Sequence, residues 1–153
     1  VVVGADDSSG APDAAVWTSA DGEAWTRATE PVFGGPGAQH ATGVATDATG
    51  RVVAVGTDDA LGTLDGAAWI LADNAGWQRA VTDALGLGGL GNQSPRAVTS
   101  GPGGWRAVGA EVAAGNDVLV PMLWEASDGS SWTRARRTSS SRSPCPRRAS
   151  TSS

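Results

Sequence analysis

The sequence of 153 residues has no lysine or tyrosine, and it has one histidine, one cysteine, one methionine and one phenylalanine. The single cysteine, Cys145, cannot form a disulfide bond within the chain, so the redox compartment is not readable. The single histidine, His40, excludes a metal cluster built from several histidines. No apolar run of about 18 residues occurs, so no transmembrane helix and no membrane partner are expected.

No secretory signal is visible, and the chain begins at Val1 inside an expected strand. Secretion and display at the cell surface therefore stay open, and the sequence alone does not define the compartment. Positive charge is scarce in most of the chain: residues 1–133 hold all 16 acidic residues and five arginines, whereas residues 134–153 hold six arginines and no acid. Because phosphates need cations, no nucleic-acid partner is expected.

Glycine and tryptophan are abundant, with 22 and seven residues, and six of the tryptophans belong to a repeated segment. A segment occurs three times, at 16–28, 68–80 and 123–135. In each copy a tryptophan is followed by aspartate, a second tryptophan and arginine at constant spacing. The repeated residues are Trp17, Asp21, Gly22, Trp25 and Arg27, then Trp69, Asp73, Asn74, Trp77 and Arg79, then Trp124, Asp128, Gly129, Trp132 and Arg134.

The Asp-Gly or Asp-Asn step lies between two runs rich in Trp, Val, Ile and Thr, and it predicts a β-hairpin with a tight turn. Glycine or asparagine supplies the positive φ that such a turn needs. The second tryptophan and the arginine are two residues apart, so on a strand they share one face. The tryptophans are interpreted as buried packing anchors covered by the arginine stems.

Each hairpin follows a valine-rich strand that contains a glycine, at 1–7, 52–59 and 105–111. Before the second and third of these strands another strand is expected, at 42–50 and 95–104. The unit then has four antiparallel strands in about 50 residues, which is typical of a β-propeller blade. The sequence therefore predicts an all-β fold, a partial propeller of two to three four-stranded blades.

The blade boundaries follow from this spacing. Residues 1–30 form a partial first blade without its opening strand, residues 31–82 a second blade and residues 83–135 a third. The Arg- and Ser-rich tail 136–153 has almost no apolar side chains to offset the entropy of ordering, and it is predicted to be disordered.

The three copies resemble the BNR or Asp-box repeats of sialidase-type β-propellers, whose pattern is Ser-x-Asp-x-Gly-x-x-Trp. Ser19, Asp21, Gly22 and Trp25 approach this pattern, as do residues 127–132, but here aspartate and glycine are adjacent. In that family the box is a structural turn on the outer hairpin of the blade. The resemblance therefore implies architecture and not activity.

A sialidase-like site, as the family has it, needs a tyrosine nucleophile paired with glutamate, an aspartic acid and an arginine triad. The chain has no tyrosine, and its repeated arginines indicate one structural position copied three times. A glycosidase needs two carboxylates at a set separation, and the spacing singles out no pair. No cofactor is expected. His40 and the glycine-rich run 86–91 are interpreted as parts of the connectors between blades.

The repeated acids Asp6, Asp7, Asp58 and Asp59 are the only candidates for a metal, since carboxylates of one loop can bind Ca²⁺ if enough oxygens converge. Solvated loop acids explain them equally well. The sequence favours a non-enzymatic binding or scaffold module for a protein or glycan, and self-association or association with missing blades is expected. The alternatives are a fragment of a sialidase-like or other glycoside hydrolase with catalytic residues outside this chain, and a truncated, non-functional product.

Overall fold

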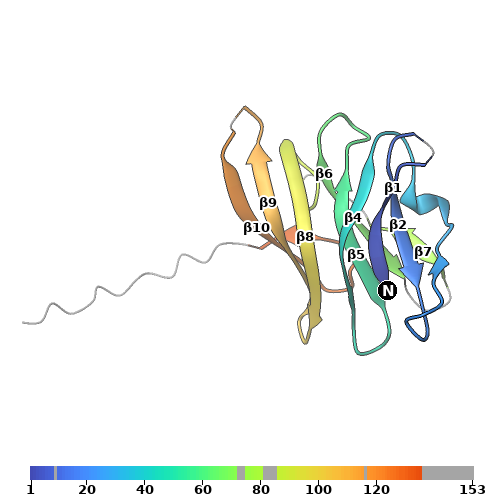
Figure 1. Cartoon of the computed structure of the whole chain (residues 1–153). Helices are drawn as coiled ribbons and strands as arrows, with labels where there is room; N and C mark the ends of the chain where they lie inside the picture. Colours follow the sequence, from blue (N-terminus) through green and yellow to red (C-terminus); the bar gives the residue numbers. More distant parts are fainter. Residues whose placement is uncertain (9, 72–74, 81–85, 116, 136–153) are drawn as a thin grey trace, which may run out of the picture.

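The computed structural model describes residues 1–8, 10–71, 75–80, 86–115 and 117–135. The tail 136–153, with Cys145, and the turn residues Asp73 and Asn74 lie outside the described residues. The described residues form three antiparallel sheets of three or four strands (Figure 1), so the all-β prediction is confirmed. None of the described segments is a helix that is long and apolar enough to cross a membrane.

Within each sheet, neighbouring strands follow one another in the chain, and every pairing is antiparallel. Sheet 1 consists of β1 (Val2–Asp6), β2 (Asp13–Thr18) and β3 (Thr26–Arg27). Sheet 2 consists of β4 (Gln39–Thr46), β5 (Val52–Asp58), β6 (Asp65–Leu71) and β7 (Trp77–Arg79). Sheet 3 consists of β8 (Gly91–Gly101), β9 (Gly104–Ala113), β10 (Leu119–Ala126) and β11 (Thr133–Arg134). A short 3₁₀ turn, η1 (Pro31–Phe33), lies between sheets 1 and 2 in the chain.

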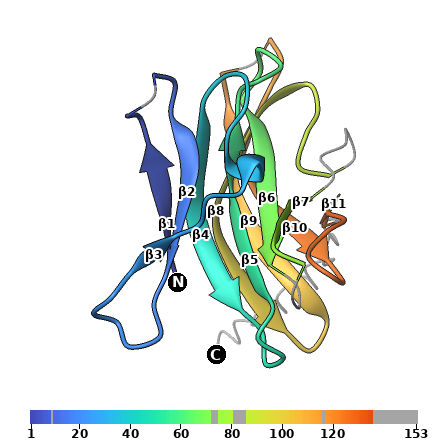
Figure 2. The same cartoon turned by 90° about the vertical axis from the view of Figure 1, so that its right-hand side faces the viewer.

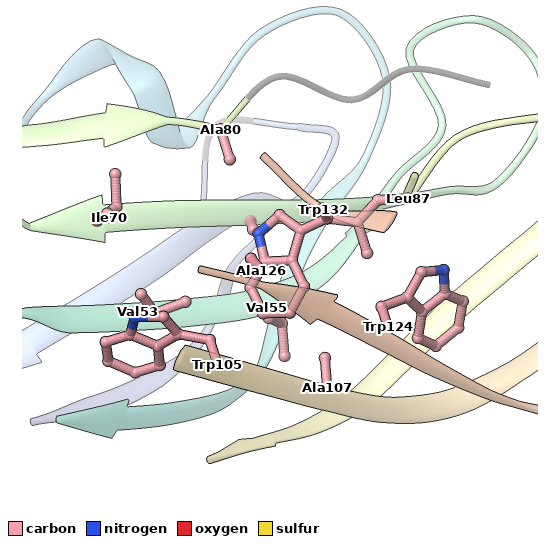
Figure 3. Packing of buried hydrophobic residues seen from close by; sticks show 11 residues of the cluster. Val53, Val55, Ile70, Ala80, Leu87, Trp105, Ala107, Trp124, Ala126 and Trp132 are labelled. Carbon is pink, nitrogen blue, oxygen red and sulfur yellow. The ribbon is translucent and has the colours of Figure 1, made fainter. Parts of the chain in front are cut away.

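Sheet 2 is the middle layer, and it buries one face against each neighbour (Figure 2). Because successive side chains of a strand point to opposite faces, the apolar run of β6 supplies both cores. Trp69 packs with Val16 of sheet 1 and with Phe33 of η1. Ile70 and Val53 pack with tryptophans of sheet 3, which Figure 3 shows at close range. The fold is therefore held together by two sheet-on-sheet interfaces of the same kind.

The first tryptophan of each repeat lies directly opposite the arginine across two paired strands. Trp17 pairs with Arg27, and the same register recurs in sheets 2 and 3. The guanidinium of Arg27 lies 5.9 Å from the centre of the Trp17 ring. The sequence suggested that the arginine covers the second tryptophan, two residues before it; the structure shows Arg27 over the first, Trp17, because directly opposed residues on paired strands are close neighbours.

The tight two-residue turn predicted for the hairpin is also wrong. Thr18 pairs with Thr26, so seven residues, 19–25, connect β2 to β3. The prediction of a positive φ is confirmed, with +80° at Gly22 and +83° at Gly129. The turn is longer because the Asp21 carboxylate takes the place of a tight backbone turn, accepting hydrogen bonds from the backbone N–H groups of Glu23 and Ala24, both at 2.9 Å.

Exposure differs between equivalent positions of the three sheets. Trp77 and Trp132 are buried as predicted, but the corresponding Trp25 is 44% exposed. Likewise, β5 is buried along nearly its whole length, whereas Val2 of the equivalent β1 is 46% exposed. The prediction of burial is therefore wrong for Trp25. Trp25 and Val2 of β1 are both exposed because, within the described residues, sheet 1 packs on one neighbour only.

Candidate functional site

Each sheet carries an ion pair between the repeated arginine and an acid two residues after the strand glycine. Arg27 pairs with Asp6, Arg79 pairs with Asp58, and Arg134 Nε lies 3.2 Å from Glu111 Oε2. The ends of the sheets at which these acids lie are called the acidic ends. Because the arginine also lies over the first tryptophan in sheets 1 and 2, the pairs have a clear structural role.

The aspartates of the hairpin turns are hydrogen-bonded within their own loops. Asp128 Oδ1 accepts from the N–H of Ser130 at 2.9 Å, and Trp132 Nε1 donates to the carbonyl of Gly129 at 2.8 Å. The pKa of Asp128 is lowered by the side-chain and backbone hydrogen bonds from Ser130. Backbone hydrogen bonds from Ala24 and Glu23 lower the pKa of Asp21 in the same way. These carboxylates stabilise the turns.

The four candidates for Ca²⁺ do not converge on one point. Asp6 and Asp58 are paired with arginines, and Asp59 accepts a hydrogen bond from the N–H of Ala38, while Asp7 is exposed. In the part of the chain that the structure describes, no group of three or more His, Cys, Asp or Glu side chains is arranged to hold a metal ion. The repetition of Asp6 and Asp58 follows from the repeated ion pair.

Of the two segments predicted to be connectors, one lies in a strand and the other is a connector. His40 lies in β4, paired with Thr57, so its placement in a connector is wrong. The described part of the glycine-rich run is a packed connector: the carbonyl of Gly86 accepts a hydrogen bond from Trp124 Nε1 at 3.2 Å, and Leu87 is fully buried.

Two glutamines that the sequence did not single out lie near the start of the first strands of sheets 2 and 3: Gln39 begins β4, and Gln93 is the third residue of β8. Gln39 and Gln93 are both fully buried. Gln39 Nε2 donates to Asp58 Oδ1 at 3.0 Å and to the carbonyl of Pro36 at 2.7 Å. The available signal in the sequence was a shared spacing, since each glutamine is followed four residues later by Gly or Ala and then by Val.

Asp58 and Asp65 lie opposite each other on the paired strands β5 and β6. Their pKa values are shifted in opposite directions. Burial raises the pKa of Asp58, but the hydrogen bonds from Gln39 and Ala60 and the charge of Arg79 outweigh it, so its pKa is lowered. Burial raises the pKa of Asp65. Its Oδ1 is buried and has no hydrogen-bond partner among the described residues.

Asp65→Asn is expected to raise the free energy of unfolding at pH 7. The folded state holds the Asp65 proton more tightly than the unfolded chain does. The ionised carboxylate therefore destabilises the fold in full above the raised pKa, and this destabilisation disappears below the unfolded pKa of about 3.8. Asp58→Asn is expected to have the opposite effect, because its stabilisation is present above 3.8 and is lost as the pH falls through its lowered pKa. Urea unfolding at pH 7 and below pH 4 measures both, and a less stable Asp65→Asn protein at pH 7 would contradict the expectation.

A groove of about 510 Å³ lies at the acidic end, between β2, β3 and the segment that contains η1. Asp13 and Glu30 supply carboxylates, Arg27 supplies a guanidinium, and Phe33 supplies an aromatic ring. The backbone approaches closely here, since a Cβ at Gly34 would lie 2.8 Å from Asp13 Oδ1. A lining that combines charged groups of both signs with apolar residues suits an uncharged polar or zwitterionic ligand.

Comparison of the chain with protein-family models, curated proteins and solved structures gave no match. The class is therefore defined by the geometry alone: an all-β protein of three stacked antiparallel sheets, with an ion pair at the acidic end of each sheet and a polar groove between sheet 1 and the segment that contains η1.

Proposed function

We propose that the three sheets are successive blades of a sialidase-type β-propeller, the first of them incomplete. The support is the repeated strand order together with the repeated interface, since sheet 3 packs on sheet 2 as sheet 2 packs on sheet 1. Propeller blades gain their stability from this nearest-neighbour packing. Sheets 1 and 3 are then the ends of an open array.

The two end faces support the proposal of self-association or of contact with further blades. On sheet 1 the outer face carries Val2, whose equivalents Ala54 and Ala107 are fully buried. On sheet 3 the outer face carries Val108 and Leu119, which are 50% and 66% exposed. Exposed apolar faces and sheet edges favour association.

We further propose that the chain is a non-enzymatic binding or scaffold module, which recognises a glycan or peptide in the groove at the acidic end. The single observation that carries this proposal is the groove itself, which places Arg27 and the carboxylates of Asp13 and Glu30 around Phe33. No catalytic step is assigned, because the chain has no tyrosine nucleophile and the spacing of its acids singles out no pair.

The experiment uses the whole purified chain. Its mass is first measured by size exclusion with light scattering, and a mass above that of one chain is expected. The chain is then applied to arrays of neutral and acidic oligosaccharides and of extended peptides, and the strongest ligand is titrated by calorimetry. Arg27→Gln is expected to weaken this binding about tenfold or more, in line with the loss of a hydrogen bond to a charged group.

Arg106→Gln is the matched control. Arg106 forms a similar exposed ion pair, with Glu125 at 2.9 Å, but it lies on sheet 3 outside the groove. It should leave the affinity unchanged. Equal weakening by the two variants, or no ligand in either array, refutes the binding proposal, and a clean monomer refutes self-association.

A further inference from the structure

The strand glycine has a defined task in sheets 2 and 3. Gly56 of β5 faces a β-bulge in β4, where the register shifts between Ala41 and Gly43. A Cβ at Gly56 would lie 1.8 Å from the carbonyl oxygen of His40, so only glycine fits. The bulged strand bends so that one of its carbonyl groups occupies the place of a side chain on its neighbour.

Sheet 3 repeats the same arrangement. Gly109 of β9 faces a bulge between Pro95 and Ala97 of β8, and a Cβ at Gly109 would lie 2.0 Å from the carbonyl oxygen of Ser94. In both four-stranded sheets, therefore, the strand glycine lies directly opposite a β-bulge of the neighbouring strand.

Gly4 of β1 has the same place in the repeat, but β1 is an edge strand. A Cβ at Gly4 would meet only the Trp17 ring, at 3.6 Å, which is an ordinary contact. Nothing in the described part of sheet 1 requires glycine at this position. A glycine at this position would be needed if a bulged strand paired with β1, as β4 pairs with β5 and β8 pairs with β9.

Two other residues of β1 also match residues that contact the first strand in sheet 2. Asp6 corresponds to Asp58, which accepts a hydrogen bond from the opening glutamine of β4. Val2 is 46% exposed, whereas the equivalent Ala54 is covered beside Val44. Figure 1 shows β8, β4 and β1 at the near edges of the three sheets, and β4 contacts both of the others. An added strand next to β1 would lie beside β4, as β4 lies beside β8.

We propose that the open edge of β1 is an acceptor site for an extended peptide strand, which pairs antiparallel with β1 and places a β-bulge opposite Gly4. The occupant has the chemistry shared by β4 and β8: a glutamine, followed four residues later by Gly or Ala and then by Val. Backbone hydrogen bonds provide the affinity, and the positions of Gly4, Asp6 and Val2 fix the register of the added strand. The inference rests on strand register and is independent of the groove.

The probe is the chain's own opening strand, attached to the complete chain. A copy of residues 39–52 is placed before Val1, which joins it in register because Val53 corresponds to Val1. Attachment raises the effective concentration of the strand at the edge. The midpoint of thermal unfolding is expected to rise by about 5 °C. Amide hydrogen exchange is expected to slow at alternate residues of β1, whose N–H groups gain partners.

Gly4→Ala is the discriminating variant. In the original chain it should leave the midpoint within about 1 °C, because the added methyl group finds ordinary contact distance. In the extended chain it should remove the gain, because the methyl group meets the carbonyl of the copied His40. A scrambled extension of the same composition should give no gain. An unchanged midpoint in the extended chain overturns the proposal, and so does a gain that survives Gly4→Ala or scrambling.

Discussion

Replacing Trp69 with alanine is expected to lower the free energy of unfolding by about 3–5 kcal/mol, the range for truncating a large core residue. Trp69 is fully buried, and its Nε1 donates to the carbonyl of Val32 at 2.8 Å. Its ring packs 6.3 Å from that of Phe33 and supports the guanidinium of Arg79 at 5.6 Å. Truncation would open a cavity in the middle of an interface between two sheets, and urea unfolding followed by circular dichroism measures the loss.

Trp25→Ala is the control for this prediction. Trp25 is 44% exposed, and its Nε1 donates a hydrogen bond to the carbonyl of Gly22 in its own turn, at 3.1 Å. A loss of about 1 kcal/mol or less is expected, as for surface substitutions. Equal losses in the two variants would mean that the middle sheet does not supply the core.

Gly56→Ala is expected to destabilise the fold by about 3 kcal/mol or more, at the upper end of what overpacking costs. The new Cβ would lie 1.8 Å from the carbonyl oxygen of His40 and 2.9 Å from Ala41 Cα. Both are backbone atoms of the paired strand, so no side-chain rotation relieves the collision. Thermal and urea unfolding of the purified variant measure the loss.

Gly101→Ala is the matched control. Gly101 also lies in a strand of a four-stranded sheet, at the end of β8, and no atom lies within 4 Å of the place of its Cβ. Its free energy of unfolding should change by about 0.5 kcal/mol or less. If Gly56→Ala is tolerated equally well, the bulge at Ala41 is not a feature of the folded protein.

Local patterns carried the prediction of the strands. The valine-rich run around Gly56 and the hairpin at 68–80 became β5, β6 and β7, and the expected opening strands became β4 and β8. These predictions succeeded because alternation, β-branched residues and turn residues act within a few positions of the chain. The turn length was missed for the opposite reason: hydrogen bonds from an aspartate side chain shape the loop, and the dipeptide signal does not contain them.

The residues of the candidate site could not be predicted from the sequence in the same way. The carboxylates near Asp6 and Asp58 suggested a cation, but their partners Arg27 and Arg79 are 21 residues away in the chain. The groove joins Asp13 to Glu30 and Phe33, which share no motif. Neither arrangement was predictable, because each depends on how strands from separate segments come together.

The sequence by itself determined an all-β protein with a unit repeated three times, since strand periodicity and turn chemistry are properties of short segments. Tertiary structure alone decided which repeated residues are buried. Trp25 and Trp77 occupy the same position in the repeat, yet one is exposed and the other is packed 5.3 Å from Phe33. The physical reason is that burial depends on the neighbouring sheet: sheet 2 is covered on both faces, whereas sheet 1 is covered on one.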